Sequence, residues 1–220
     1  MREGPIDSAE TVRSRIEGGL HDPSSFRAAL LSIRPAEREA WLDRVLGLGE
    51  LPDDGPELPR GCVPYLPCSI DALLRVVEAG HVCAADVFVD VGSGAGRTAA
   101  LVHLLTGADV IGIEIQPGLV LAARDLVTRL LLSRVTCIEG DATKLTGSLN
   151  AGSVFFLYCP FSGDRLAKVV SDLEPIARTR MIRLCCVGLG PLACPWLTLE
   201  AAPSGDVAIY RSTLHDEAIG

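Results

Sequence analysis

The sequence lacks a long apolar run and an apolar amino-terminal segment, and both absences argue against a membrane protein. Its most apolar region, residues 181–199, is interrupted by Arg183, Pro191 and Pro195, which disfavours a membrane-spanning helix. The first ten residues, MREGPIDSAE, contain no apolar signal region. We therefore expect a cytoplasmic protein with no membrane partner.

A cluster of basic residues is also missing. The formal net charge is −8 and the isoelectric point is about 5.0. Proteins that bind long nucleic acids neutralise phosphates with patches of lysine and arginine, and the sequence shows no such patch. The composition therefore favours a small molecule or a protein as substrate, and we expect no nucleic-acid partner.

The eight cysteines form no metal-binding pattern. No two of them are spaced as C-x-x-C, and no histidine stands at ligand spacing from them, so we expect no metal. Cys137, Cys185 and Cys186 lie inside apolar runs, where a reduced thiol behaves as a small hydrophobic group.

The most informative stretch of the chain is residues 87–114, VFVDVGSGAGRTAALVHLLTGADVIGIE. A short apolar run ends at Asp90, a glycine-rich turn follows at 92–96, and a helical pattern covers 97–106. A second apolar run then ends at Glu114. Strand, glycine turn, helix, strand and acid together predict the first unit of a nucleoside-binding parallel sheet.

The remaining segments predict the rest of an α/β domain. Further strands are expected at 134–139, 153–159 and 181–187, followed by a hairpin over 197–212. We therefore predict a Rossmann-like, doubly wound sheet of about seven strands with a carboxy-terminal antiparallel hairpin.

The residues that precede the sheet are predicted to cover it. Residues 1–48 show helical apolar faces and are expected to form a helical amino-terminal cap, with packing favoured over a substrate lid. Residues 49–67 are rich in proline and are predicted to be an extended linker that covers the cofactor. Residues 68–220 then form the catalytic domain.

Two classes of cofactor compete for the glycine turn. A dinucleotide-binding turn reads G-x-G-x-x-G, but Arg97 stands where the third glycine should be. The acid at Asp90 repels a pyrophosphate and attracts a cationic amino-acid headgroup, and Glu114 is placed to bind ribose hydroxyls. These features favour S-adenosylmethionine over a nicotinamide cofactor, while Arg97 is expected to pair with a local carboxylate.

Over residues 64–212 the sequence resembles the class I S-adenosylmethionine-dependent methyltransferases. The resemblance rests on VDVGSGAGR, IGIEI, IEGDAT and FFLYCPF. It is nearest to small bacterial methyltransferases whose fourth motif reads like L-Y-N-P-F. More distantly, the sequence is similar to the non-SET histone-lysine methyltransferases, which also pair a D-x-G-S-G turn with a proline-rich segment. The resemblance implies S-adenosylmethionine as cofactor and S-adenosylhomocysteine as product.

The resemblance implies a role for each position along the pocket. Asp90 and the backbone of Gly92, Ser93 and Gly94 would hold the methionine part of the cofactor, and Glu114 would bind the ribose hydroxyls.

For the adenine base of the cofactor, the resemblance implies that Ile115 packs against the ring and that Asp141 accepts a hydrogen bond from the amino group. Ala142 would lie beside it. The alternative for Asp141 is a plain turn residue at the end of a strand.

At the methyl-transfer end, the resemblance places Tyr158 and Cys159 in the wall and Tyr65 over the cofactor. The alternative for Tyr65 is that it merely packs on the linker. Tyr158 and Cys159 are the candidate catalytic residues. Cys159 replaces the asparagine of the relatives, and a thiol is a weaker donor and acceptor than an amide. A buried thiol is favoured over a nucleophile, which needs a base and a lowered pKa.

The function predicted from these residues is methyl transfer from S-adenosylmethionine to a small molecule or a protein side chain. The alternative, suggested by Cys159, is a sensor or partner subunit that binds S-adenosylmethionine without efficient transfer. A nicotinamide-dependent oxidoreductase is a third and weaker interpretation.

Overall fold

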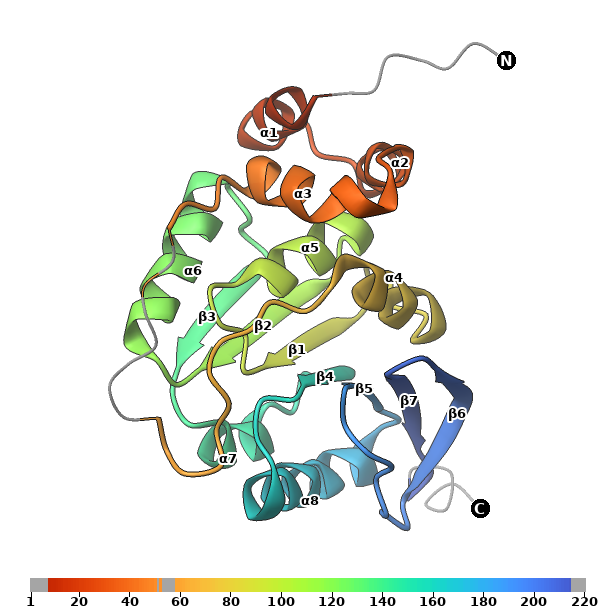
Figure 1. Cartoon of the computed structure of the whole chain (residues 1–220). Helices are drawn as coiled ribbons and strands as arrows, with labels where there is room; N and C mark the ends of the chain where they lie inside the picture. Colours follow the sequence, from red (N-terminus) through yellow and green to blue (C-terminus); the bar gives the residue numbers. More distant parts are fainter. Residues whose placement is uncertain (1–7, 51, 53–57, 215–220) are drawn as a thin grey trace.

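The computed structural model describes residues 8–50, 52 and 58–214, except for the side chains of residues 201–204. In this part of the chain a seven-stranded sheet has the order β3-β2-β1-β4-β5-β7-β6 (Figure 1). The strands are β1 Val87–Val91, β2 Asp109–Glu114, β3 Val135–Glu139, β4 Val154–Tyr158, β5 Arg183–Val187, β6 Leu197–Ser204 and β7 Val207–Ser212. The first five are parallel, and β7 pairs antiparallel with both β5 and β6. The predicted fold class, including the terminal hairpin, is confirmed.

Helices cover both faces of this sheet (Figure 1). One face carries α4 Ile70–Ala79, α5 Arg97–Thr106 and α6 Pro117–Arg129, with the cap helices α1 Ala9–Glu17, α2 Pro23–Ser32 and α3 Arg38–Leu46 packed beyond them. The other face carries α7 Ala142–Leu145 and α8 Gly163–Thr179. Short 3₁₀ turns lie at Pro35–Glu37 and Thr146–Ser148. Among the described residues, no helix combines the length and the apolar character that crossing a membrane requires.

The alternation of side chains along β1 decides where Asp90 points. Phe88 is buried in the core beneath α4 and α5, whereas Val89 and Val91 are buried in the core beneath α8. Because successive side chains of a strand point to opposite faces, Asp90 shares the face of Phe88. Its carboxyl group therefore lies under the cap side of the molecule, at the carboxyl end of a central strand.

The cap is joined to the sheet through Arg97, the first residue of α5. Its side chain is 5% exposed and donates to Asp43 (2.8 Å) and Glu39 (2.6 Å) of α3 and to the backbone oxygen of Cys68 (3.2 Å). Glu39 also accepts from the backbone nitrogen of Ile70 at the start of α4. The prediction that Arg97 pairs with local carboxylates is confirmed. The arginine that replaces the third glycine of the motif thus joins the cap to the sheet.

The helices of the cap lie where the sequence predicts them, and their apolar faces pack into the same core as α4 and α5. Trp41, Leu42 and Leu30 are almost completely buried there. Residues 51 and 53–57 of the predicted linker lie outside the described residues. The division of the chain into cap, linker and catalytic domain stays a prediction.

Replacing Arg97 by methionine should lower the free energy of unfolding by about 2 kcal/mol, because the change leaves two carboxylates and a carbonyl without their buried donor. Chemical denaturation of the purified protein measures this change. Arg178→Met is the control, since Arg178 is 62% exposed and pairs with Glu174 along the same helix. The control should change stability by less than about 0.5 kcal/mol. Equal effects of the two variants would contradict a special role for Arg97.

Candidate functional site

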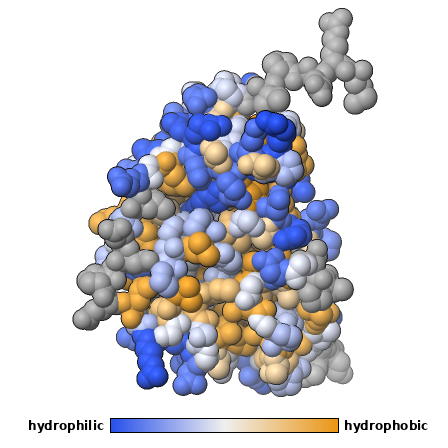
Figure 2. Space-filling model, in the orientation of Figure 1, coloured by the Kyte–Doolittle hydropathy of each residue, from blue (hydrophilic) through white to orange (hydrophobic). Residues whose placement is uncertain are grey.

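A cavity of about 810 Å³, including its open mouth, lies at the carboxyl end of the parallel strands. Its wall is made by residues 58 and 62–66, Gly92, residues 113–116, Gly140, Ala142, residues 158–161 and Arg165. Ligands of open α/β sheets bind at this edge, where the strand order reverses between β1 and β4. On the face shown in Figure 2, hydrophilic residues cover the cap and hydrophobic residues gather below it.

Several of the residues predicted from the sequence line this cavity: Tyr65, Gly92, Glu114, Ile115, Ala142, Tyr158 and Cys159. Ser93, Gly94 and Asp141 are not in the lining itself but adjoin it: Ser93 and Asp141 neighbour lining residues in the chain, and Gly94 lies against the ring of Tyr65. Asp90 is not in the lining either and is buried two residues before Gly92. The structure therefore brings the predicted positions from β1, β2, β3 and β4 to one edge of the sheet.

Asp90 is a buried carboxyl group with an unpaired oxygen. Its side chain belongs to a residue only 2% exposed, and Oδ2 has no hydrogen-bond partner among the described residues. Burial, together with the nearby charge of Glu114, raises the pKa of Asp90 to about 7. The hydroxyl of Ser93 is also buried, and no described residue pairs with it. Buried polar groups of this kind require a ligand or water to satisfy them, and the acid suits a cation.

Glu114 is held in place by the backbone around it. Oε2 accepts from the backbone nitrogen of Gly94 (2.9 Å) and Oε1 accepts from that of Gln116 (2.8 Å). Each ionised carboxylate oxygen has a further lone pair available. Because the carboxylate is fixed at the wall of the cavity, it can accept from two neighbouring hydroxyl groups such as those of a ribose.

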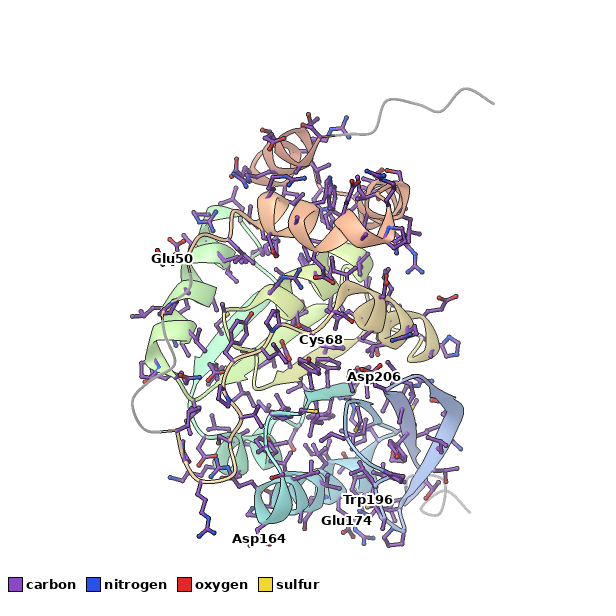
Figure 3. The ribbon with its side chains drawn as sticks, viewed as in Figure 1. Glu50, Cys68, Asp164, Glu174, Trp196 and Asp206 are labelled. Carbon is purple, nitrogen blue, oxygen red and sulfur yellow. The ribbon has the colours of Figure 1, made fainter. Side chains whose placement is uncertain are left out.

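The glycine turn is shaped by close approach. The backbone nitrogens of Gly92 and Ser93 both donate to the oxygen of Ile113, which ties the turn to β2. A Cβ atom on Gly94 would stand 2.0 Å from the ring of Tyr65, so the ring lies directly on the turn. Tyr65 thus reaches the glycine turn from the amino-terminal side. Cys68, labelled in Figure 3, follows it just ahead of α4.

At the end of β3 the carboxylate of Asp141 already has partners. Its Oδ1 accepts from the backbone nitrogen (3.0 Å) and the hydroxyl (2.8 Å) of Thr143 and from Arg165 (2.5 Å). Burial alone would raise the pKa of Asp141, but the Thr143 hydrogen bonds and the charge of Arg165 lower it. Asp141 therefore acts as the amino-terminal cap of α7, and its Oδ2 is left to accept from another group.

Cys159 has an unusual backbone conformation and a thiol that is hydrogen-bonded to the backbone. Its φ is +40°, a left-handed conformation that is costly for a residue with a side chain. The thiol donates to the carbonyl of Val187 (3.3 Å), and burial raises its pKa. Burial also raises the pKa of the neighbouring Tyr158. A nucleophilic cysteine needs a lowered pKa, so the raised pKa argues against a nucleophile. Cys159 is nevertheless only partly buried, since it lies in the cavity wall.

The prediction that the linker covers the cofactor did not include the residues with which the linker pairs. Cys62 forms an antiparallel bridge with Phe161, Val63 donates to the oxygen of Pro160, and Ser162 donates to that of Gly61. We call residues 58–66 the strap, because they cross over the cavity and pair with the loop after β4. Arg165 was missed as well, since nothing in its own sequence neighbourhood marks it as a cavity residue.

Comparison with protein families gives one match: residues 89–173 match the methyltransferase domain. This range contains Asp90, Glu114, Asp141 and Tyr158 and runs from β1 into α8. The chain carries a methyltransferase domain. Its enzyme class is that of the S-adenosylmethionine-dependent methyltransferases, and S-adenosylmethionine is the cofactor. No curated protein matches the chain.

Solved structures show the same fold as this methyltransferase. An RNA methyltransferase from Salinibacter ruber, in complex with S-adenosyl-L-homocysteine, has a TM-score of 0.51 at 24% identity, covering 68% of this chain and 94% of its own. The yhhF protein of Escherichia coli, proposed to be a methyltransferase, has a TM-score of 0.53 at 18% identity, covering 71% and 90%. A Staphylococcus aureus protein proposed to be a caffeoyl-CoA O-methyltransferase has a TM-score of 0.52 at 12% identity, covering 68% and 85%. At these identities the likeness concerns the fold alone.

The raised pKa of Asp90 predicts how the stability of the unliganded methyltransferase depends on pH. The folded state keeps a proton up to about pH 7, whereas the unfolded state loses it near the ordinary value of 3.8, so stability falls as the pH rises between them. Asp90→Asn removes this loss, which is at most about 1.4 kcal/mol per pH unit. The stability gained by the variant should therefore grow from pH 5 to pH 7 and then level off, as thermal melts would show.

Asp109→Asn is the control for this experiment. Asp109 is exposed, and a hydrogen bond from Arg134 lowers its pKa, so it is ionised in both states across pH 5 to 8. Its effect on the melting temperature should be the same throughout that range. A constant effect of Asp90→Asn would show that the buried carboxyl does not titrate as described.

Proposed function

We propose that this methyltransferase holds S-adenosylmethionine along the carboxyl edge of β4, β1, β2 and β3 and transfers its methyl group to a small molecule or a protein side chain. The observation that carries the proposal is the buried, unpaired Oδ2 of Asp90 beside the glycine turn. It fits the α-ammonium group of an amino-acid headgroup, which would bring the missing hydrogen bond and the missing charge.

The other cofactor contacts follow from the order of the strands. Since β2 lies next to β1 and β3 next to β2, a ligand anchored at Asp90 passes Glu114 and ends at β3. Asp90 and the turn of Gly92, Ser93 and Gly94 would hold the methionine part, and Glu114 the two ribose hydroxyls. The base would then lie between Ile115 and Ala142, within reach of Asp141.

The methyl-transfer end of the cavity has uncharged walls. When bound, S-adenosylmethionine supplies an electrophilic methyl group on a sulfonium. Tyr65, Tyr158 and Cys159 surround this end, and none of them is an acid or base poised near neutral pH. The walls can orient an acceptor and exclude water, and positioning is the main requirement of an in-line displacement. The acceptor should therefore carry a nucleophile that needs no strong base.

The mouth of the cavity adds an apolar surface for the acceptor. Val63 and Leu66 of the strap are 47% and 62% exposed and line the same cavity. Exposed apolar side chains at a rim favour a partner with an apolar part. This supports a small molecule or a protein side chain as acceptor and agrees with the absence of a basic patch in the sequence.

The second candidate function is cofactor binding without efficient transfer. Cys159 supports it, because its thiol is engaged with a backbone carbonyl and cannot position a substrate as an amide does. Turnover of labelled S-adenosylmethionine against a panel of metabolites and peptides separates the two. Transfer to any acceptor favours the enzyme, and tight binding without transfer favours the sensor.

Glu114→Gln should weaken the binding of S-adenosylhomocysteine at least about tenfold, as measured by calorimetry. Both oxygens of Glu114 accept from backbone N–H groups, so an amide nitrogen would face a donor whichever way it is turned. Glu139→Gln is the matched control, because Glu139 is the exposed residue opposite Glu114 on β3. The control should bind as the wild type does. If the wild type binds neither S-adenosylmethionine nor S-adenosylhomocysteine, the proposed function is wrong.

A further inference from the structure

Arg165 is a cavity residue for which the proposed function leaves no task. It is the third residue of α8, whose start is marked by Asp164 in Figure 3, and its side chain is 20% exposed. A cation in the first turn of a helix opposes the helix dipole. Its place therefore depends on contacts outside the helix.

Those contacts reach three separate segments around one end of the cavity. The guanidinium donates to Oδ1 of Asp141 (2.5 Å) at the end of β3 and lies 5.9 Å from the ring centre of Phe161 after β4. Its stem lies beneath the strap, since a Cβ atom on Gly61 would stand 3.6 Å from Arg165 Cδ. Burial raises the pKa of the Cys62 thiol, and the charge of Arg165 opposes this rise.

The side chain of Arg165 contains a buried hydrogen-bond donor, Nε. It has no partner among the described residues, and Arg165 belongs to the cavity wall together with Gly140 and Ala142, the residues that flank its partner Asp141. Beside it, the Oδ2 of Asp141 remains available as an acceptor. A buried, unpaired donor beside an available acceptor forms a recognition element for a group that offers the complementary pair.

We infer that Arg165 is a specificity-determining residue for the base of the cofactor. It fixes the carboxylate of Asp141 to accept from the amino group of adenine, and its own Nε donates to a nitrogen of the adenine ring. The same guanidinium holds the strap and the loop after β4 over the base. This inference rests on the proposed function, because it assumes that the base lies at the end of β3.

Adenine offers an amino donor beside an unprotonated ring nitrogen, and the pair of Asp141 and Arg165 matches this pattern. Hypoxanthine offers a carbonyl and a protonated ring nitrogen instead, so both contacts become unfavourable. A site built to hydrogen-bond one edge rejects the analogue that lacks it, because its own buried groups are left unpaired. The methyltransferase should therefore distinguish S-adenosylhomocysteine from S-inosylhomocysteine.

The experiment compares the two ligands by calorimetry in the wild type, Arg165→Met and Arg165→Lys. The wild type should prefer S-adenosylhomocysteine at least about tenfold. Arg165→Met keeps the apolar stem and should lose about tenfold in affinity for S-adenosylhomocysteine but much less for S-inosylhomocysteine. Arg165→Lys keeps the charge near Asp141 and should recover part of the preference. Lys168→Met, one turn further along α8 and paired with Asp172 at the surface, is the control and should leave both affinities unchanged.

Two results would overturn the inference. One is an Arg165→Met variant that binds S-adenosylhomocysteine as the wild type does. The other is an equal loss of affinity for both ligands. Arg165 would then stabilise the strap without contributing to recognition of the base. Failure of the wild type to bind S-adenosylhomocysteine at all would instead overturn the proposed function. Thermal melts of each variant separate these results from a loss of folding.

Discussion

The burial of Asp90 without a partner is the constraint on which the site depends. A carboxyl group under the cap, with one oxygen unpaired, costs free energy in the unliganded protein, and the raised pKa expresses this cost. The rest of the fold maintains that burial. Because β1 lies between β2 and β4, the neighbouring strands shield the carboxyl group from water. The ring of Tyr65 lies on the glycine turn that follows β1. In the proposed function a cationic headgroup would relieve this cost, so the same feature that weakens the empty protein would favour the bound one.

The cap and the strap connect this site to the amino-terminal part of the chain. Arg97 links α3 to the start of α5 and to the backbone of Cys68, and so fixes the segment that carries Tyr65. The strap then pairs with the loop after β4 over the cavity, and Arg165 joins both to the end of β3. Residues far apart in the sequence thereby form one enclosure around the cofactor pocket. Arg97 and Arg165 lie at different ends of this enclosure, and the proposed function places the methionine part toward the first and the base toward the second.

The sequence was sufficient to predict the fold and the candidate site residues at the carboxyl ends of the strands. Periodicity and glycine placement are local properties, and they located β1, the glycine turn, β2 and Glu114 correctly because strand order and edge follow from the α/β rules. The pairing of Arg97 with carboxylates was also predictable, since the residue breaks a motif. The contacts of Arg165 and Cys62 were not predictable, because they depend on how three loops meet in space. The left-handed backbone conformation of Cys159 could not be predicted for the same reason, because no sequence pattern indicates such a conformation at a cysteine.

The measurement that tests the account most directly is a crystal structure of the protein with S-adenosylhomocysteine bound. The account predicts the α-ammonium group within hydrogen-bond distance of Asp90 Oδ2, both ribose hydroxyls on Glu114, and the base at Ala142 next to Arg165. A ligand bound elsewhere, or one that leaves Asp90 buried and unpaired, would contradict it.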